Sequence, residues 1–399
     1  MKRLSYQGLW FGPAALLALV GCASDKAECS DVSGTACTWA GVQQHRGFNK
    51  DGLDKQDSWL GFVSDLTFAP DGRPWIVDWN NHRIRRVEHD GTLKTMIGTG
   101  YEGDGPPGET DRLPLGNALG AQADTVALNH PTDLEFAPNG TAVLASWHNN
   151  KIREMDPETG IVKVLAGNSY GFTGEGVPAY EAVFNQPKAL AIDDAGQIYL
   201  IDQRNERIRV IGTDEARTIH TLAGDGERAY SGDGGDASLA QFWWDGGTTP
   251  TPNGSLVFRG TELYIADTKN NRIRKIDLTT NKISCIAGIG TPGNSGDGGS
   301  ALLAELNEPL DLELGPDGRL YVADTYNNVI RAIDLDTGII ERVAGTGEPC
   351  ATKTNCFEAA EGLDALSVRF AHPYGIAFDP TGNLYVADTD NSRIVRIAK

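Results

Sequence analysis

The sequence has few of the features on which catalysis or membrane insertion usually depends. Its 399 residues include three methionines, six cysteines and seven histidines, and the histidines are scattered. No Ser-His-Asp or Cys-His arrangement accompanies them, so no convincing set of residues for nucleophilic catalysis stands out. After the first 22 residues, no apolar run is long enough to cross a bilayer.

Positive charge is also scarce. The chain holds 35 Lys and Arg against 54 Asp and Glu, a formal net charge of −19. Such a surface repels phosphate backbones, so we expect no nucleic-acid partner. The Gly-Asp-Gly loops at 224–238 and 288–300 lack the spaced carboxylates of a calcium loop and the Lys-Ser/Thr pair of a phosphate-binding loop. Their glycines therefore indicate backbone turns.

The six cysteines fit an oxidising compartment. Cys29 and Cys37, or Cys350 and Cys356, could each be bridged across a small loop. Cys285 is expected to be a buried small hydrophobe in the fourth strand of its repeat. These spacings do not indicate a metal site.

What the chain does contain is one unit repeated six times. In its clearest copy, residues 306–347, apolar residues alternate through Leu310, Leu312 and Leu314 and then recur in three short runs, which predicts four strands. Turn residues such as Gly, Asn and Asp separate the runs. We therefore expect each copy to fold as a four-stranded antiparallel meander. The other copies lie at 61–100, 128–170, 184–226, 242–290 and 370–399.

Each copy carries an Asp-like residue followed three positions later by Asn, between its second and third strands. The pairs are Asp78 and Asn81, Ser146 and Asn149, Asp202 and Asn205, Asp267 and Asn270, Asp324 and Asn327, and Asp388 and Asn391. Arg side chains follow on the third strand. Because the pattern recurs in every copy, we interpret it as structural: Asn holds the turn and Asp pairs with Arg. Four-stranded units about 56 to 68 residues apart are typical of β-propeller blades.

The segment LYVADTYNNVIRAID at 320–334 and the AGTG that follows at 344–347 resemble the NHL-repeat family of propellers. The resemblance covers about residues 40 to 399 and implies an all-β, six-bladed propeller of four-stranded antiparallel blades. The family includes RNA-binding proteins, receptor-kinase sensor domains and an amidating lyase, so it does not fix the function. The fourth copy departs from the pattern where Trp243 and Trp244 replace the usual residue-Pro entry.

The two ends of the repeat array complement each other. Residues 37–41 (CTWAG) resemble the fourth strands of the inner copies, whereas the last copy stops at Lys399 after three strands. We therefore expect the N-terminal strand to complete the sixth blade and close the ring, which removes exposed edges. The propeller would then comprise residues 37–399.

The N-terminus has the pattern of a secretory signal. A basic pair precedes a short apolar run ending in LVGC at 19–22, which is typical of a signal peptide over residues 1–21. LVGC resembles the bacterial lipobox. The resemblance implies a lipid on Cys22, a polar tether over 22–36 and a place in the cell envelope, with Ala23 favouring the outer membrane. An ordinary cleaved signal with an incidental Cys is the alternative.

Strand order predicts where a site would lie. In an up-and-down blade, the loop entering the first strand and the turn between the second and third strands lie on one side of the disc, here called the long-loop face. The other side, the short-turn face, has only Pro-Asp-Gly and Asp-Thr-Gly turns. The leading hypothesis is a non-catalytic recognition or scaffold module that binds an envelope protein or a glycan through the long-loop face. A propeller that merely stabilises an envelope assembly is a weaker alternative.

The residue that enters the first strand varies among the copies. The six are Phe62, His130, Gln186, Trp244, Glu308 and His372. His130, Glu308 and His372 could hold a divalent metal such as zinc or calcium, as histidines do in the amidating lyase. The alternative function is therefore a metal-dependent lyase or hydrolase at the channel mouth. The plainer interpretation is a polar channel lining, under which no cofactor is expected.

Four tryptophans stand at positions where other copies of the repeat have other residue types. Trp79 and Trp147 follow the Asp-like position in neighbouring copies, and Trp243 and Trp244 open the fourth copy. Exposed indoles on a polar face could stack on sugar rings or anchor a peptide, so these four are the candidate ligand-binding residues. Packing between blades is the alternative.

Overall fold

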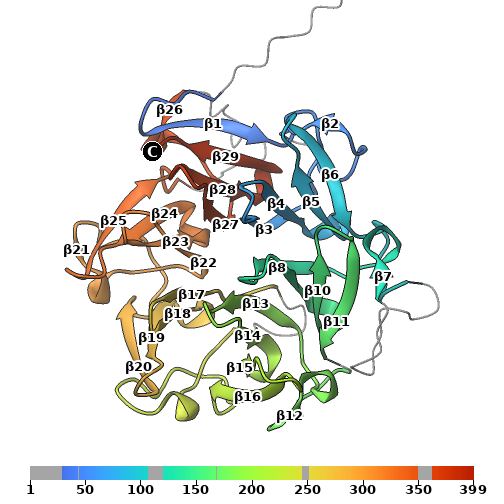
Figure 1. Ribbon diagram of the computed structural model, residues 1–399. Helices are drawn as coiled ribbons and strands as arrows, with labels where there is room; N and C mark the ends of the chain where they lie inside the picture. Colours follow the sequence, from blue (N-terminus) through green and yellow to red (C-terminus); the bar gives the residue numbers. More distant parts are fainter. Residues whose placement is uncertain (1–28, 44, 107–119, 168, 245–250, 349–361) are drawn as a thin grey trace, which may run out of the picture.

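Six antiparallel sheets surround a central axis like the blades of a propeller (Figure 1). The computed structural model describes residues 29–43, 45–106, 120–167, 169–244, 251–348 and 362–399. The predicted six-bladed propeller is confirmed. Within these ranges no helix has the length and apolar character needed to cross a membrane.

In blades 1 to 5 the four long strands run from the central axis to the rim in chain order, and in blade 6 the outermost long strand is the N-terminal β1. Blade 1 contains β2 (Leu53–Asp54), β3 (Val63–Phe68), β4 (Pro74–Asp78), β5 (Arg83–Val87) and β6 (Thr92–Ile97). Blade 2 contains β7 (Ala121–Gln122), β8 (Pro131–Phe136), β9 (Ala142–Ser146), β10 (Lys151–Asp156) and β11 (Ile161–Ala166). Blade 3 contains β12 (Val177–Pro178), β13 (Pro187–Ile192), β14 (Ile198–Asp202), β15 (Arg207–Ile211) and β16 (Thr218–Ala223).

The remaining three blades repeat this order. Blade 4 contains β17 (Leu256–Arg259), β18 (Glu262–Asp267), β19 (Arg272–Asp277) and β20 (Lys282–Ala287). Blade 5 contains β21 (Gly299–Ser300), β22 (Pro309–Leu314), β23 (Leu320–Asp324), β24 (Val329–Ile333) and β25 (Ile339–Ala344). Blade 6 contains β26 (Leu363–Asp364), β27 (Pro373–Phe378), β28 (Leu384–Asp388), β29 (Arg393–Ile397) and β1 (Thr35–Ala40).

Short 3-10 helices join these strands on the long-loop face and at the rim. Those between the second and third strands are η1 (Trp79–Asn81), η3 (Trp147–Asn149), η5 (Gln203–Asn205), η7 (Thr268–Asn270), η9 (Thr325–Asn327) and η11 (Thr389–Asn391). Those in the loops that enter the blades are η2 (Ala123–Thr125), η4 (Ala179–Glu181), η6 (Ala237–Leu239), η8 (Ala301–Leu303) and η10 (Ala365–Ser367).

The second strand of the blades lies deepest between its neighbours. In β4, β9, β14, β23 and β28 every residue is buried. Both faces of these strands pack against adjacent blades, which is why their sequences are nearly continuous apolar runs rather than alternating ones. The core is accordingly divided among the spaces between blades, as where Phe242 and Trp244 pack against Ile201 and Ile265.

Five sheets contain a fifth strand of two residues beyond the predicted four. This strand comes from the loop that enters the blade, which runs along the rim and pairs with the blade's outermost long strand, as β2 does with β6. In blade 4 the equivalent contact is a single bridge between Asp236 and Lys282. The extra pairing covers part of the edge that a four-stranded blade would expose.

The ring is closed as predicted. Strand β1 pairs with β29, with Ala36 opposite Ile397, and so supplies the fourth strand of blade 6. Cys29 and Cys37 form one of the two anticipated disulfides. Cys350, Cys356 and Cys22 lie outside the described residues. Cys285 lies in β20 as expected, where it is partly rather than fully buried.

Candidate functional site

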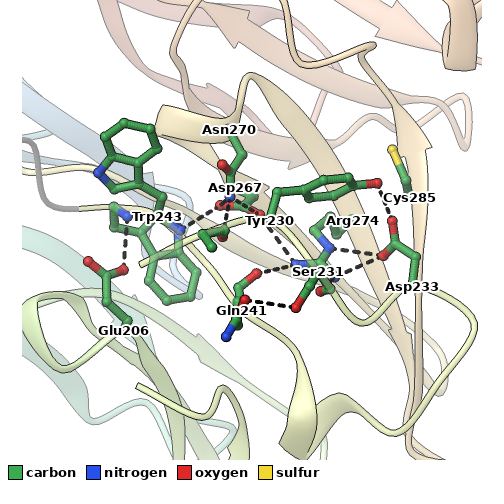
Figure 2. A network of polar contacts seen from close by, with 12 residues as sticks. Glu206, Tyr230, Ser231, Asp233, Gln241, Trp243, Asp267, Asn270, Arg274 and Cys285 are labelled. Atoms are coloured by element: carbon green, nitrogen blue, oxygen red, sulfur yellow. Dashed lines mark hydrogen bonds and ion pairs between the residues drawn. The ribbon is translucent and has the colours of Figure 1, made fainter. Parts of the chain in front are cut away.

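The repeated Asp-x-x-Asn turn is a buried hydrogen-bond centre. In blade 4, Asp267 is fully buried and accepts from the Trp243 backbone N–H at 3.0 Å and from the Asn270 amide at 2.9 Å (Figure 2). The Arg274 guanidinium lies 3.4 Å from the same carboxylate. Burial raises the pKa of Asp267 to about 6, although Arg274 and Asn270 oppose that shift. The structural interpretation of the motif is confirmed.

In five blades the Asn of the turn has a second partner, which gives this repeated residue a further structural role. Its amide donates to a backbone carbonyl of the long loop entering the same blade. These bonds join Asn81 to Gly47, Asn149 to Gly103, Asn205 to Gly171, Asn270 to Ala229 and Asn327 to Gly293, at 2.6 to 2.9 Å. The Asn therefore fixes the loop as well as the turn.

In blade 2, where the turn has no Asp, different residues make the equivalent contacts. Position 146 is Ser, whose buried hydroxyl has no hydrogen-bond partner. The Asn149 side-chain oxygen instead accepts the Asn129 backbone N–H at 3.0 Å. Asp104, from the entering loop, pairs with Lys151 at 2.5 Å and with Arg153 at 2.7 Å. In blade 2 a loop carboxylate thus contacts both cations of the third strand, including Arg153, whose equivalents in blades 1, 3, 4 and 5 also contact the turn carboxylate.

Aromatic residues of the entering loops cover the paired Arg side chains. The rings of Phe48, Phe172 and Tyr230 lie 3.9 to 4.2 Å from the first Arg of the third strand in blades 1, 3 and 4, and about an ångström further from the second. Cation–π contacts of this kind stabilise a guanidinium away from water. Sequence reasoning missed these rings, although each follows the loop residue whose carbonyl the Asn binds.

Neighbouring blades are joined by another repeated contact that sequence reasoning missed. The residue after each turn Asn is left-handed, and in five blades its side chain accepts the backbone N–H of the residue that enters the next blade. The acceptors are His82, Asn150, Glu206, Asn271 and Asn328, and the donors are His130, Gln186, Trp244, Glu308 and His372. We call each such contact a seam latch. Its sequence signal is a polar side chain directly after the Asn.

The three metal-ligand candidates do not form one site. Glu308 pairs with Lys269 at 2.5 Å, and His372 Nδ1 lies 2.7 Å from Asp390. His130 instead contacts other histidines. Across the described part of the chain, no group of three or more His, Cys, Asp or Glu side chains is placed to hold a metal ion. The predicted triad is therefore wrong, because its blades lie apart around the ring and each side chain has a nearer partner.

The candidate tryptophans divide into buried and accessible ones. Trp147 and Trp244 are 1% and 0% exposed, so the expectation that they present free indoles is wrong. Trp147 donates to Gln203 of the next blade at 3.0 Å, and Trp244 donates to the Ala266 carbonyl at 2.7 Å. Both therefore pack within or between blades. Trp79 is half-buried and Trp243 is 41% exposed, so a binding role for these two stays a prediction.

Histidines and tryptophans of blades 1 and 2 cluster on the long-loop face. The His130 ring lies 4.5 Å from His82 and 4.8 Å from His148. Trp79 contacts His130 at 4.3 Å, and Trp147 stacks on His148 at 4.1 Å. Burial, together with the neighbouring His82 and His148, lowers the pKa of His130 to about 4. The cluster is therefore neutral at pH 7.

A cavity of about 510 Å³ opens beside this cluster, between the loops that enter blades 2 and 3. Glu102, Asn129, His148 and Lys151 line it, and Tyr170, which is 64% exposed, stands at its rim. We call it the blade-2 cavity. Its volume is that of a small-molecule site. Carboxylate, amide and imidazole groups beside an exposed phenol suit a polar ligand with one apolar face, such as a sugar or a peptide side chain.

The central channel is strongly acidic. Asp65, Asp133, Glu135, Asp311 and Glu313 line a cavity of about 320 Å³ between the innermost strands. Burial, together with repulsion from Asp311 and Asp133, raises the pKa of Glu313 to about 8. The carboxylates also connect blades, because Asp133 accepts from a backbone N–H of blade 3 and Asp311 from one of blade 6, both at 2.8 Å.

Comparison with known proteins identifies the repeat. A family model described as NHL repeat matches residues 370–397. Human NHL repeat-containing protein 2 is 24% identical over 314 residues, which cover 70% of this chain and 41% of that protein. Protein SUPPRESSOR OF QUENCHING 1 of Arabidopsis thaliana is 27% identical over 270 residues, covering 66% of this chain and 24% of that protein. The chain thus spans less than half the length of these relatives.

Solved structures support the same fold. A protein of Bacteroides thetaiotaomicron described as an auxiliary nutrient binding protein superposes with a TM-score of 0.59 at 14% identity, over 90% of this chain and 75% of that one. A counterpart from Bacteroides ovatus gives a TM-score of 0.60 at 16% identity, over 91% and 76%. Together with the six Asn-anchored repeats, these matches identify the chain as a six-bladed NHL-repeat β-propeller.

Proposed function

We propose that this protein is a recognition or scaffold module of the bacterial cell envelope, anchored by lipid on Cys22, that binds a protein or a glycan through its long-loop face. One observation carries the proposal: the positions that recur in every blade hold the fold, whereas the positions that vary gather on one face. Variation among equivalent positions is expected where a repeat protein recognises a partner.

The middle residue of the turn between the second and third strands supplies most of this variation. Across the six blades it is Asn80, His148, Arg204, Lys269, Tyr326 and Asp390. These residues are exposed or half-buried, whereas the Asp-like residues two positions earlier are completely buried. The ring offers amide, imidazole, cationic, phenolic and carboxylate groups. Such a set favours a polar partner of defined shape over an apolar surface.

The blade-2 cavity adjoins this ring and gives the face a concave part. It shares His148 with the ring, and Tyr170 marks its outer rim. An exposed aromatic ring beside convergent polar groups is common at sites for sugars and peptide side chains. Solved propellers of this fold are described as nutrient-binding proteins, which is compatible with a binding role.

The exit of the N-terminal segment supports an outward orientation of the long-loop face. Strand β1 is the fourth of its blade, so it begins at the short-turn face and ends at the long-loop face. Residues before it are held near the short-turn face, because Arg396 near the end of β29 donates to the Ser30 carbonyl and Gly34 donates to the Ala398 carbonyl. A lipid on Cys22 would therefore tether the disc from the short-turn side.

Binding by the long-loop face can be tested with matched arginine variants. Arg204 belongs to the variable ring, and Arg319 lies after the first turn of blade 5 on the short-turn face. Envelope proteins and envelope-derived oligosaccharides would be offered as separate pools to the immobilised protein. We expect Arg204→Ala combined with Tyr326→Ala to weaken the retained interaction at least tenfold and Arg319→Ala to leave it unchanged. Equal effects of the two variants would contradict the proposal.

The lipid anchor has its own test. Mass spectrometry of the mature N-terminus is expected to find a diacylated Cys22, and Cys22→Ser is expected to release the protein from the membrane fraction. An unmodified N-terminus at another residue would contradict the lipid anchor and indicate an ordinary secreted protein.

A further inference from the structure

The seam between blades 1 and 2 differs from the other seams in the chemistry of its latch. At the four later seams that carry the latch, the acceptor is a side-chain oxygen of Asn150, Glu206, Asn271 or Asn328, at 2.8 to 3.0 Å from the donor nitrogen. At the first seam the acceptor is the Nδ1 atom of His82, 3.2 Å from the His130 backbone nitrogen. Among these five latches only this one depends on an imidazole.

An imidazole nitrogen accepts a hydrogen bond only while it carries no proton. Protonation of His82 would place an Nδ1–H opposite the His130 N–H, so two donors would face each other and the latch would break. The amide oxygens of Asn do not titrate, and a carboxyl group such as that of Glu206 keeps an acceptor oxygen whether or not it is protonated. The first seam is therefore the one whose latch can open in mild acid.

The groups around His130 limit how many of the neighbouring imidazole nitrogens can carry a proton at one time. Its Nδ1 lies 3.0 Å from His148 Nδ1, so this pair has room for one proton between them. The Asn129 side-chain oxygen lies 2.7 Å from His130 Nδ1 and 3.3 Å from His148 Nδ1, so it accepts from whichever of the two atoms carries the proton. A second proton would put an N–H on both Nδ1 atoms, so that two donors would face each other. Protonation of any of the three imidazoles therefore disturbs a hydrogen bond of the cluster.

We propose that the contact between His82 and His130 is a pH-operated latch between blades 1 and 2, which holds the blade-2 cavity in its present form at neutral pH and releases it in acid. The link to the cavity is direct, because His148 touches His130 and also lines the cavity. As a mode of regulation this inference rests on the proposed function of the long-loop face.

The charged groups around the latch determine where it titrates. Burial lowers the pKa of His82 below its usual 6.5, the Glu102 carboxylate opposes that shift, and Arg83 lowers the pKa further. His148 follows the same pattern, with burial lowering its pKa and Glu102 opposing. Release of the latch therefore belongs below pH 6.5, and Glu102 is the carboxylate that a protonated cluster would face.

The latch can be tested without any ligand. Amide hydrogen exchange, measured by NMR and expressed as protection relative to the intrinsic rate at each pH, would be compared at pH 7.5 and 5.0. We expect the protection of the His130 N–H to fall at least tenfold at pH 5.0. The N–H groups of Gln186 and Glu308 make the same latch to Asn oxygens, so their protection should change by less than twofold.

His82→Asn is the decisive variant, because it installs the acceptor that Asn150, Asn271 and Asn328 already provide. We expect it to keep the His130 N–H protected at both pH values. Retention of wild-type protection at pH 5.0, or the same acid-induced loss in His82→Asn, would overturn the proposal. The comparison of His130 with Gln186 within the wild-type protein decides the matter even if the variant does not fold. A negative result here leaves binding by the long-loop face intact, since that claim rests on the separate variants of the variable ring.

Discussion

Removal of the turn carboxylate from one blade tests the account of the repeated motif. Asp324 of blade 5 is fully buried and accepts from the Asn307 backbone N–H and the Asn327 amide, both at 2.8 Å. It also lies 3.5 Å from Arg331. Asp324→Ala would delete all three contacts without changing the strands themselves.

The loss can be estimated contact by contact. Asn327 keeps its bond to the Gly293 carbonyl, and Arg331 keeps Asp297 at 2.8 Å. The Asn307 N–H loses its acceptor, which costs about 1 to 3 kcal/mol for a buried donor. Weakening the buried ion pair and leaving a small cavity add to this cost. We therefore expect Asp324→Ala to lower the free energy of unfolding by about 3 kcal/mol at pH 7.

Blade 2 supplies the matched control. Ser146 occupies the same position, is fully buried and makes no hydrogen bond through its hydroxyl. Ser146→Ala should therefore change the free energy of unfolding by less than about 1 kcal/mol. Urea denaturation followed by tryptophan fluorescence would compare the two variants. Similar losses for both, or no loss for Asp324→Ala, would refute the role assigned to the carboxylate.

Three further predictions concern charge. The pKa of Glu313 is raised to about 8, so the protonated carboxyl favours the folded state and its contribution, present below pH 4.5, is lost as the pH rises towards 8. Glu313→Gln should therefore stabilise the protein by about 2 kcal/mol at pH 8.5 and by little at pH 5, where the first figure allows for screening by solvent in the channel. Urea denaturation at the two pH values would test this, and equal gains in the free energy of unfolding would contradict it. Tyr230→Leu removes a ring from above two guanidiniums and should cost about 1 kcal/mol in thermal denaturation, whereas Tyr101→Leu, at a residue 79% exposed, should cost nothing measurable. Asp104→Asn should lower the free energy of unfolding by about 3 kcal/mol and Asp297→Asn by about 1 kcal/mol, because the turn of blade 2 has no carboxylate of its own while that of blade 5 does. The reverse order would contradict the interpretation that Asp104 takes the place of the missing turn carboxylate in blade 2.

The fold followed from the sequence because its signals are local and repeated. Alternating apolar residues and Gly- or Asp-rich turns defined the strands of each blade, and the missing fourth strand of the last copy matched the spare strand at the N-terminus. The role of Asp and Asn was also predictable, since six recurrences argue for a structural task. The partner of the Asn amide was not, because the carbonyl it binds lies 34 to 46 residues earlier in the chain.

The site was less predictable, for physical reasons that particular residues show. The position of Trp147 in a turn suggested exposure, but its indole reaches Gln203 of the next blade and is buried there. Likewise, Glu308 was paired with distant histidines on sequence grounds, whereas Lys269 of the preceding blade lies beside it. Both errors concern contacts between blades, which depend on the angle between repeats rather than on any local pattern.

The central claim, recognition through the long-loop face, is most directly tested by hydroxyl-radical footprinting of the protein in its native envelope and after purification. Tyr170, Trp243 and Tyr326 report on the long-loop face, and Ile339 at the start of β25 reports on the short-turn face. We predict that the envelope protects the first three residues from labelling and leaves Ile339 labelled as in the purified protein. Protection of Ile339 with the three aromatic residues unprotected would contradict the account.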